Sequence, residues 1–135
     1  MNKHTLVIVT AVLLAVILAS AVVAQEAREI WMGGYMLLRI RNGAGGYSLD
    51  QRVAEIQLRA NNLLQLDRNI ESFTIRRSGN DANIYADGAL FMTVTPADAA
   101  ANGTTVEGLA RVWAQRLRTI YPEARARRPG NVTPG

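Results

Sequence analysis

The side chains able to carry chemistry in this sequence are mainly carboxylates. The chain holds 11 acidic residues but no Cys and a single His, His4 near its start. A His-based triad, a thiol nucleophile and an ordinary zinc site all need imidazole or thiolate groups, so the sequence argues against each of them. The aspartates fall at expected turns and helix caps, where local hydrogen bonding accounts for them. They are Asp50, Asp67, Asp81, Asp87 and Asp98. We therefore predict no catalytic residue, no metal and no cofactor.

A glycine-rich loop, Asn42-Gly43-Ala44-Gly45-Gly46-Tyr47, follows an expected strand and precedes an expected helix. Backbone N–H groups of such a loop can hold an anion. The loop lacks the Lys of a phosphate-binding loop and the third spaced Gly of a dinucleotide loop, so we interpret it as a connector. An enzyme that uses carboxylates or this loop is the alternative, and a deep pocket lined by Asp50, Arg41 and the backbone of 43–46 would favour it.

Aromatic side chains alternate with arginines on the expected outward face of the sheet. Such a face can stack on sugars, hold lipid headgroups or contact a protein. Ordinary solvated cross-strand pairs are the alternative interpretation. The predicted binding residues are Trp31, Arg39, Arg41, Arg76, Tyr85 and Phe91.

The elements that position these residues are duplicated in the sequence. Residues 30–40 match residues 84–94 at an offset of 54, with an aromatic after each Ile and a Gly at the same place. Residues 48–56 match 104–112 at an offset of 56. We interpret this as one hairpin–helix unit used twice, the alternative being two unrelated well-formed units.

The second hairpin turns at Asp87-Gly88, a strong hairpin signal. A three-residue loop over 86–88 gives a regular alternation of inward and outward side chains, and a two-residue loop does not, so we predict the former. Leu37 and Phe91 then face outward. The inward residues are Ala82, Ile84, Leu90, Met92 and Val94 and, by the repeat, Ile30, Met36, Leu38 and Ile40.

Two amphipathic helices are expected to start at capping boxes, one from Ser48 and Gln51 and one from Thr104 and Glu107. The predicted fold is α+β in the order β-β-α-β-β-β-α, with both helices on one face of a mostly antiparallel sheet. We expect this domain to span residues 25–123 and residues 124–135 to form a disordered basic tail.

Residues 1–24 have the pattern of a targeting segment. Lys3 precedes an uncharged apolar run over 5–24, and small residues lead up to Ala24. A signal peptide cut after Ala24 is the preferred interpretation. A retained anchor is the alternative, because about 20 apolar residues can cross a bilayer as a helix. We therefore predict an extracytoplasmic protein, periplasmic or secreted, with tethering to the inner membrane by residues 5–24 as the second possibility.

The net charge of +4 is concentrated in the expected tail at Arg125, Arg127 and Arg128 rather than in a patch on the domain. This distribution argues against nucleic acid as a partner. The partners predicted are an envelope protein or a membrane surface, with self-association as a further option. We predict a non-enzymatic exported binding module, and the alternative is an accessory subunit of a membrane complex held by its leader helix.

Four segments together resemble a known family. They are Arg39-Ile40-Arg41 with the glycine-rich loop, Tyr47–Arg52, Leu90–Ala99 and Leu109–Ala114. They resemble the N-terminal periplasmic domain that precedes some bacterial small-conductance mechanosensitive channels, over residues 30–121. The resemblance implies a small non-catalytic domain beside a membrane. Channel activity is not implied, because no pore helices follow residue 122.

Overall fold

The computed structural model of the protein describes residues 26–128. The expected leader and residues 129–135 of the expected tail lie outside the described residues. The elements are β1 (Arg28–Met32), β2 (Tyr35–Ile40), α2 (Leu49–Gln65), β3 (Phe73–Ser78), β4 (Asp81–Ala86), β5 (Ala89–Val94), α3 (Pro96–Ala101) and α4 (Val106–Ala126). The predicted α+β class and element order are confirmed, with α3 as the short turn that Thr95-Pro96 starts. No helix within residues 26–128 is long and apolar enough to cross a membrane.

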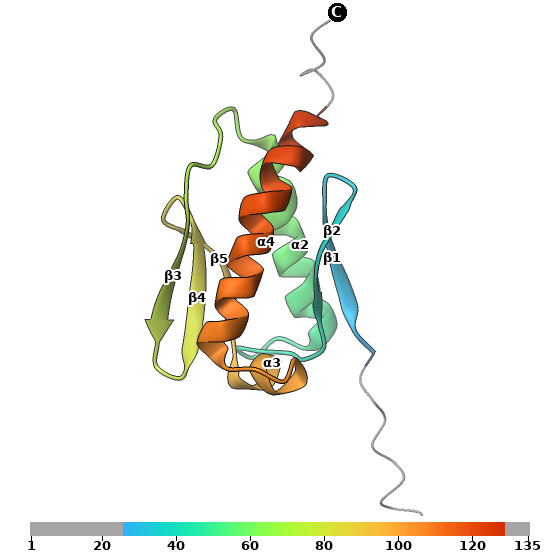
Figure 1. Ribbon diagram of the computed structural model, residues 1–135. Helices are drawn as coiled ribbons and strands as arrows, with labels where there is room; N and C mark the ends of the chain where they lie inside the picture. The colour runs from blue at the N-terminus through green and yellow to red at the C-terminus, as the bar shows by residue number, and fades with distance from the viewer. Residues whose placement is uncertain (1–25, 129–135) are drawn as a thin grey trace, which may run out of the picture.

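The strands form two antiparallel sheets, β1-β2 and β3-β4-β5. Figure 1 shows these sheets on opposite sides of the molecule, with α2 and α4 between them. Helix α2 contacts mainly β1 and β5, whereas α4 contacts all five strands and packs most closely on β2, β3 and β4. The elements therefore close a ring in the order β3-β4-β5-α2-β1-β2-α4. Each helix fills one gap between the sheets, so the two helices do not share one face of a single sheet.

Helix α2 closes the two strand edges that it separates. The side-chain amide of Gln57 accepts a hydrogen bond from Trp31 N (2.9 Å) and donates one to Trp31 O (2.7 Å), on the edge of β1. Two residues on, Arg59 donates from Nη1 to Phe91 O on the edge of β5 (3.0 Å). Residues two apart point to opposite sides of a helix, so one helix satisfies both edges.

Helix α4 closes the other two edges in the same way. Arg116 donates from Nε to Leu37 O (2.6 Å) and from Nη2 to Met36 O (2.8 Å), both on β2. Arg118, again two residues on, donates to Phe73 O on β3. Unpaired sheet edges invite strand addition by other chains, and helix side chains occupy all four outer edges at these points.

The two hairpins share a turn and a bulge, so the duplication extends to the backbone. Each turn has two residues of positive φ, Gly33-Gly34 (57° and 86°) and Asp87-Gly88 (47° and 85°). In each hairpin a bulge then inserts one extra residue into the second strand, Leu37 or Phe91. The predicted three-residue loop is therefore wrong.

The bulge changes which side chains are buried near the turn. Leu37 and Phe91, expected outward, are 0% and 1% exposed. Met36 is half-buried and Leu90 is 42% exposed, although both were expected inward. Because the turn has two residues rather than three, the residues between the turn and the bulge point to the face opposite to the predicted one. The extra residue at the bulge restores the predicted alternation farther along the strand. The remaining predicted inward residues are all buried: Ile30, Leu38, Ile40, Ala82, Ile84, Met92 and Val94.

The helix starts are also equivalent, but at a different offset from the predicted one. The Ser48–Gln51 capping box is present. The cap of α4 is Thr105, which accepts from Gly108 N, so the predicted box of Thr104 with Glu107 is wrong. Gly108, three residues after the cap, has no side chain with which to bind back. Aligning Ser48 with Thr105 gives an offset of 57 residues, and this offset brings Arg59 into register with Arg116.

Helix α4 extends beyond the expected domain boundary at residue 123. It continues through Pro122 to Ala126. Arg125 donates to Leu64 O (2.9 Å) and Arg128 to Leu66 O (3.1 Å) at the C-terminal end of α2. Helix α2 has no basic residue in its own last turn, and cations stabilise helix C-termini. The start of the expected tail therefore belongs to the domain.

Candidate binding surface beside α4

The structure divides the six predicted binding residues between the two sheets, which lie on opposite sides of the helices (Figure 1). The prediction of a single outward face assumed one sheet, and the helices in the gaps prevent that. Phe91 is buried and cannot meet a partner. Trp31 and Arg39 lie in β1 and β2, Arg41 directly follows β2, and Arg76, Tyr85 and Phe91 lie in β3, β4 and β5.

Most of these side chains make local contacts. Arg39 pairs across the hairpin with Glu29 at 3.0 Å. The Arg76 guanidinium lies 5.3 Å from the centre of the Tyr85 ring, a cation–π contact. Such pairs are typical of a solvated sheet face. Trp31 differs, because it is 45% exposed even though helix α2 holds its backbone.

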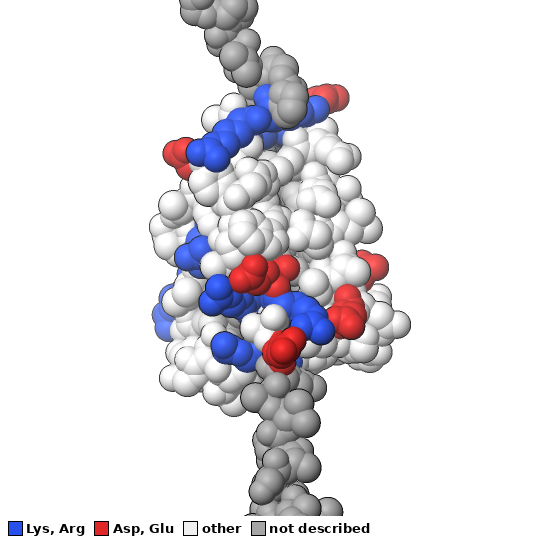
Figure 2. Space-filling model, turned by 90° about the vertical axis from the view of Figure 1, so that its right-hand side faces the viewer, with Lys and Arg blue, Asp and Glu red and all other residues white. Residues whose placement is uncertain are grey.

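The β1-β2 hairpin presents an uncharged centre. Figure 2 shows an uncharged band on this side of the molecule, between charged side chains at the top and a second charged group that spreads over the lower half. Exposed Trp31 faces half-buried Met36 across the two strands. Of this pair, only Met36 also lines the space between β2 and α4.

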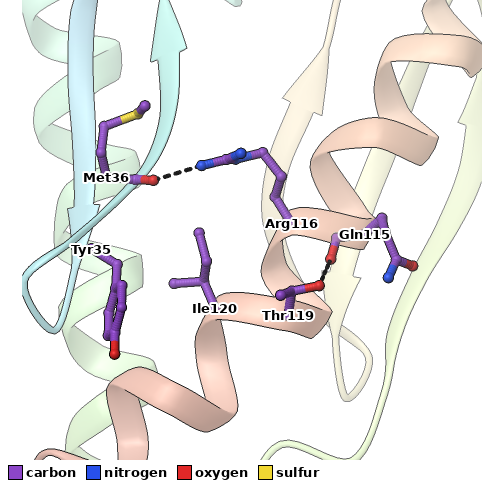
Figure 3. Close-up of a pocket in the computed structure, with 6 residues that line it drawn as sticks. All are labelled: Tyr35, Met36, Gln115, Arg116, Thr119 and Ile120. Atoms are coloured by element: carbon purple, nitrogen blue, oxygen red, sulfur yellow. Dashed lines mark hydrogen bonds between the residues drawn. The ribbon is translucent and has the colours of Figure 1, made fainter.

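A hollow of about 350 Å³ lies between β2 and α4 (Figure 3). We call it the α4 hollow. Met36 and Ile120 supply apolar wall, and Gln115 and Arg116 supply polar groups at the rim. Figure 3 shows Arg116 reaching from α4 to the Met36 carbonyl, while the Thr119 hydroxyl donates to Gln115 O (3.1 Å). The lining residues are Tyr35, Met36, Gln115, Arg116, Thr119 and Ile120.

One end of the α4 hollow is fixed by a stacked cation. The guanidinium of Arg127 lies 4.5 Å from the centre of the Tyr35 ring. A cation over an aromatic face attracts the ring quadrupole, which holds the half-buried Tyr35 against the end of α4. The wall is therefore held in place by the same residues that the sequence assigned to a disordered tail.

The arginines of α4 carry charge that the rest of the described chain does not neutralise. Arg111, Arg116 and Arg118 are exposed, and none has a carboxylate within 4.0 Å among residues 26–128. Six other arginines do pair with acids: Arg28, Arg39, Arg52, Arg59, Arg68 and Arg77. Arg116 points toward β2 and Arg118 toward β3, on opposite sides of α4, and uncompensated charge raises the local potential for anions on each side. Of the three arginines, only Arg116 lines the apolar hollow.

A second hollow occupies the equivalent position between α2 and β5. This α2 hollow has a volume of about 230 Å³. Its Arg59, Asn62 and Leu63 align with Arg116, Thr119 and Ile120 of the first hollow. Its cation is compensated, because Arg59 Nη2 lies 3.9 Å from Glu55. The two halves therefore carry hollows at equivalent positions, which differ in volume and in the pairing of their arginine.

The glycine-rich loop borders a third hollow of about 270 Å³. Its carboxylates are Glu55 and Asp81, not the expected Asp50, and Arg41 does not line it. A hydrogen bond from Arg52 to Asn42 O (2.8 Å) fixes the start of the loop. This contact fits the interpretation of the loop as a structural connector.

Arg52 and Asp98 form a buried ion pair that joins three elements. Arg52 donates to both carboxylate oxygens of Asp98, at 2.8 and 2.7 Å, and to Thr93 O at 2.8 Å. The two residues are 5% and 2% exposed. Asp98 also closes a capping box with Thr95. The predicted cap role of Asp98 is confirmed, and its second role is to neutralise Arg52.

Two further charged groups have structural roles. The Arg68 guanidinium, with N–H groups of Ser72 and Glu71, holds the pKa of Asp87 below its usual value. The Asp50 carboxylate, by hydrogen bond and then by charge, raises the pKa of Arg28. Within residues 26–128, no cluster of His, Asp or Glu has the arrangement of a metal site.

The sequence analysis missed the residues that hold the ring together. Arg52 carried a signal, because it is a polar residue within the apolar stripe of α2. A second signal is the polar pair two residues apart in each helix, Gln57 with Arg59 and Arg116 with Arg118. Their partners are backbone groups, which have no sequence signature, so the contacts could not be inferred.

The fold defines a small α+β domain with an internal duplication and a hollow beside each long helix. The chain belongs to a family described as Domain of unknown function (DUF8459), whose model matches residues 29–124. The match spans both hairpins and all three helices. No curated protein and no solved structure matches the chain. The resemblance to a periplasmic domain of mechanosensitive channels stays a prediction.

Proposed function

We propose that this protein is an exported, non-enzymatic binding module of the cell envelope that captures a partner at the α4 hollow. The observation that carries the proposal is the juxtaposition at this hollow. An apolar wall from Met36 and Ile120 lies beside the Arg116 guanidinium, which has no acidic partner within residues 26–128. Concave apolar sites with a few polar groups are typical of binding sites.

The proposed location rests on the N-terminal sequence. If residues 5–24 act as a retained anchor instead of a cut signal, the protein is an accessory subunit beside the membrane. The described domain begins at the end that carries α3, and α4 ends at the opposite end (Figure 1). An anchor before Glu26 would then leave Arg127 and Arg128 on the far side of the domain from the membrane. Mass spectrometry of the native N-terminus decides between the two, since a Gln25 start removes the anchor.

The capture proposal is tested by filling the hollow. We expect Thr119→Trp to block the α4 hollow, because Thr119 is an exposed lining residue. The matched control is Asn62→Trp, which places the same side chain at the equivalent position of the α2 hollow. Each full-length variant is used to purify bound proteins from envelope extracts, and circular dichroism confirms that both fold.

The proposal predicts that proteins held by the natural chain and by Asn62→Trp are absent with Thr119→Trp. If Thr119→Trp retains the same proteins, or if the natural chain retains none, the α4 hollow is not the capture site.

A further inference from the structure

We infer that the partner presents an acidic segment carrying an aliphatic side chain. Its carboxylates would pair with Arg116 at the rim of the α4 hollow and with Arg111, one turn before the lining residue Gln115, and its aliphatic side chain would enter the hollow. This inference rests on the proposed function and adds the chemistry of the partner.

The charge argument comes from the pairing of arginines across the described domain. Arg111 makes no hydrogen bond or ion pair within residues 26–128, and Arg116 and Arg118 bind only backbone carbonyls there. Of the acids on α4, Glu107 is paired with Arg77 at 2.7 Å. Glu123 lies one turn beyond Thr119 and makes no ion pair with any of the three arginines. Arg111 and Arg116 are about 8 Å apart along the helix axis, whereas Arg118 is turned toward β3 on the opposite side. A complementary partner therefore carries several carboxylates.

The apolar argument comes from the wall of the hollow. Arg116 Nε and Nη2 are held by the Leu37 and Met36 carbonyls, which leaves Nη1 at the rim. Met36 and Ile120 lie beside this rim (Figure 3). A ligand that places a carboxylate at Nη1 would thus set its neighbouring side chain against apolar wall. The area removed from water adds affinity that a purely ionic contact lacks.

A protein segment fits these observations better than a bilayer. Three arginines on one helix give only weak attraction to anionic lipid. The hollow is an open recess of about 350 Å³, a size that suits a single side chain rather than an extended membrane surface. Charge-assisted pairs between Arg and carboxylate also have a favourable two-pronged geometry.

The test uses synthetic peptides and the full chain. The probe is a fluorescent peptide with a central leucine flanked by glutamates. One matched peptide replaces the leucine with serine, and another replaces the glutamates with glutamines. The informative variant is Arg111→Gln, because Arg111 has no contact in the fold to lose. Its control is Arg39→Gln, which changes the net charge equally on a residue already paired with Glu29.

The inference predicts that the glutamate–leucine peptide binds best and that binding weakens as ionic strength rises. We expect Arg111→Gln to weaken it about two- to fivefold and Arg39→Gln to leave it unchanged. With Thr119→Trp the leucine and serine peptides should bind equally.

Three results would overturn the inference: equal binding of all three peptides, equal losses for Arg111→Gln and Arg39→Gln, or binding of phosphatidylserine vesicles without peptide binding. If these occur while Thr119→Trp still abolishes partner capture, the proposed function stands and only the acidic chemistry is wrong. If Thr119→Trp leaves capture unchanged, the proposed function itself fails.

Discussion

The two gaps between the sheets have the same construction but different surfaces. In each gap a helix satisfies two strand edges with polar side chains two residues apart, and an arginine binds the carbonyl of a bulged residue. On the α2 side that arginine, Arg59, is paired with Glu55. On the α4 side its equivalent, Arg116, has no acidic partner among the described residues.

This comparison distinguishes features that both halves need for folding from features that only one half has. The bulge contacts are common to both halves, because without them buried carbonyls would lose their partners. The surface charge is not needed for folding, since the α2 side forms the same structure with its charge compensated. The feature that differs between equivalent halves is therefore the better candidate for function.

The largest expected effect comes from the buried Arg52–Asp98 ion pair, which only one half of the domain has. Arg52 of α2 is equivalent to Leu109 of α4, so one half buries an ion pair where the other buries a leucine. Asp98→Ala leaves Arg52 buried without its charge partner, and we expect a loss of about 3–5 kcal/mol in unfolding free energy. Urea denaturation measures it. Combining Asp98→Ala with Arg52→Leu should recover part of the loss, and no recovery would show that the other Arg52 contacts dominate.

The second prediction concerns the turn of the first hairpin, where Gly33 takes the position that Asp87 has in the second hairpin. A Cβ at Gly33 would lie 2.6 Å from Ala124 Cβ, and the backbone there has φ +57°. Gly33→Ala should cost about 1–3 kcal/mol from crowding, with about 1–2 kcal/mol more from the left-handed backbone. Gly34→Ala is the control, because it meets nothing within 4 Å and suffers only the backbone effect. Equal melting temperatures for the two variants would contradict the packing of the turn against α4.

The third prediction tests the equivalence of the edge arginines. Arg59→Met and Arg116→Met each remove the donor to a bulge carbonyl, Phe91 O or Leu37 O. We expect each to lower the unfolding free energy by about 1–3 kcal/mol, with the larger loss for Arg116, which binds two carbonyls. Chemical denaturation of the pair measures the losses. A neutral effect in either variant would show that the two contacts are not equivalent.

The smallest expected effect concerns pH at the second turn. The folded-state pKa of Asp87 is lowered, chiefly by Arg68. The stabilising contribution of its carboxylate is therefore complete above the unfolded pKa and is lost as pH falls through the folded value. In Asp87→Asn the new side chain is compatible with the left-handed backbone but carries no charge. It should melt below the natural protein at neutral pH. The gap should begin to narrow as pH falls below the unfolded pKa of about 4 and close only below the lowered folded pKa. A gap independent of pH would contradict this.

The sequence was informative where local chemistry decides structure. The Ser48 cap, the alternation beyond each bulge and the α+β order could all be predicted from residue types. The bulges could not, because Leu37 and Phe91 suit either face and only the tertiary gap selects burial. The separation into two sheets could not be predicted either, because the helix side chains that close the strand edges bind backbone carbonyls, which have no sequence signature. None of the predicted site residues lines the α4 hollow, and Trp31 only pairs across the strands with Met36, which does.

Hydrogen exchange of the full chain with and without the glutamate–leucine peptide tests the central claim most directly. The account predicts added protection in α4 and β2, around the α4 hollow, and no change in α2 and β5. Equal protection on both sides, or protection confined to α2 and β5, would show that the charge difference between the two halves does not direct binding.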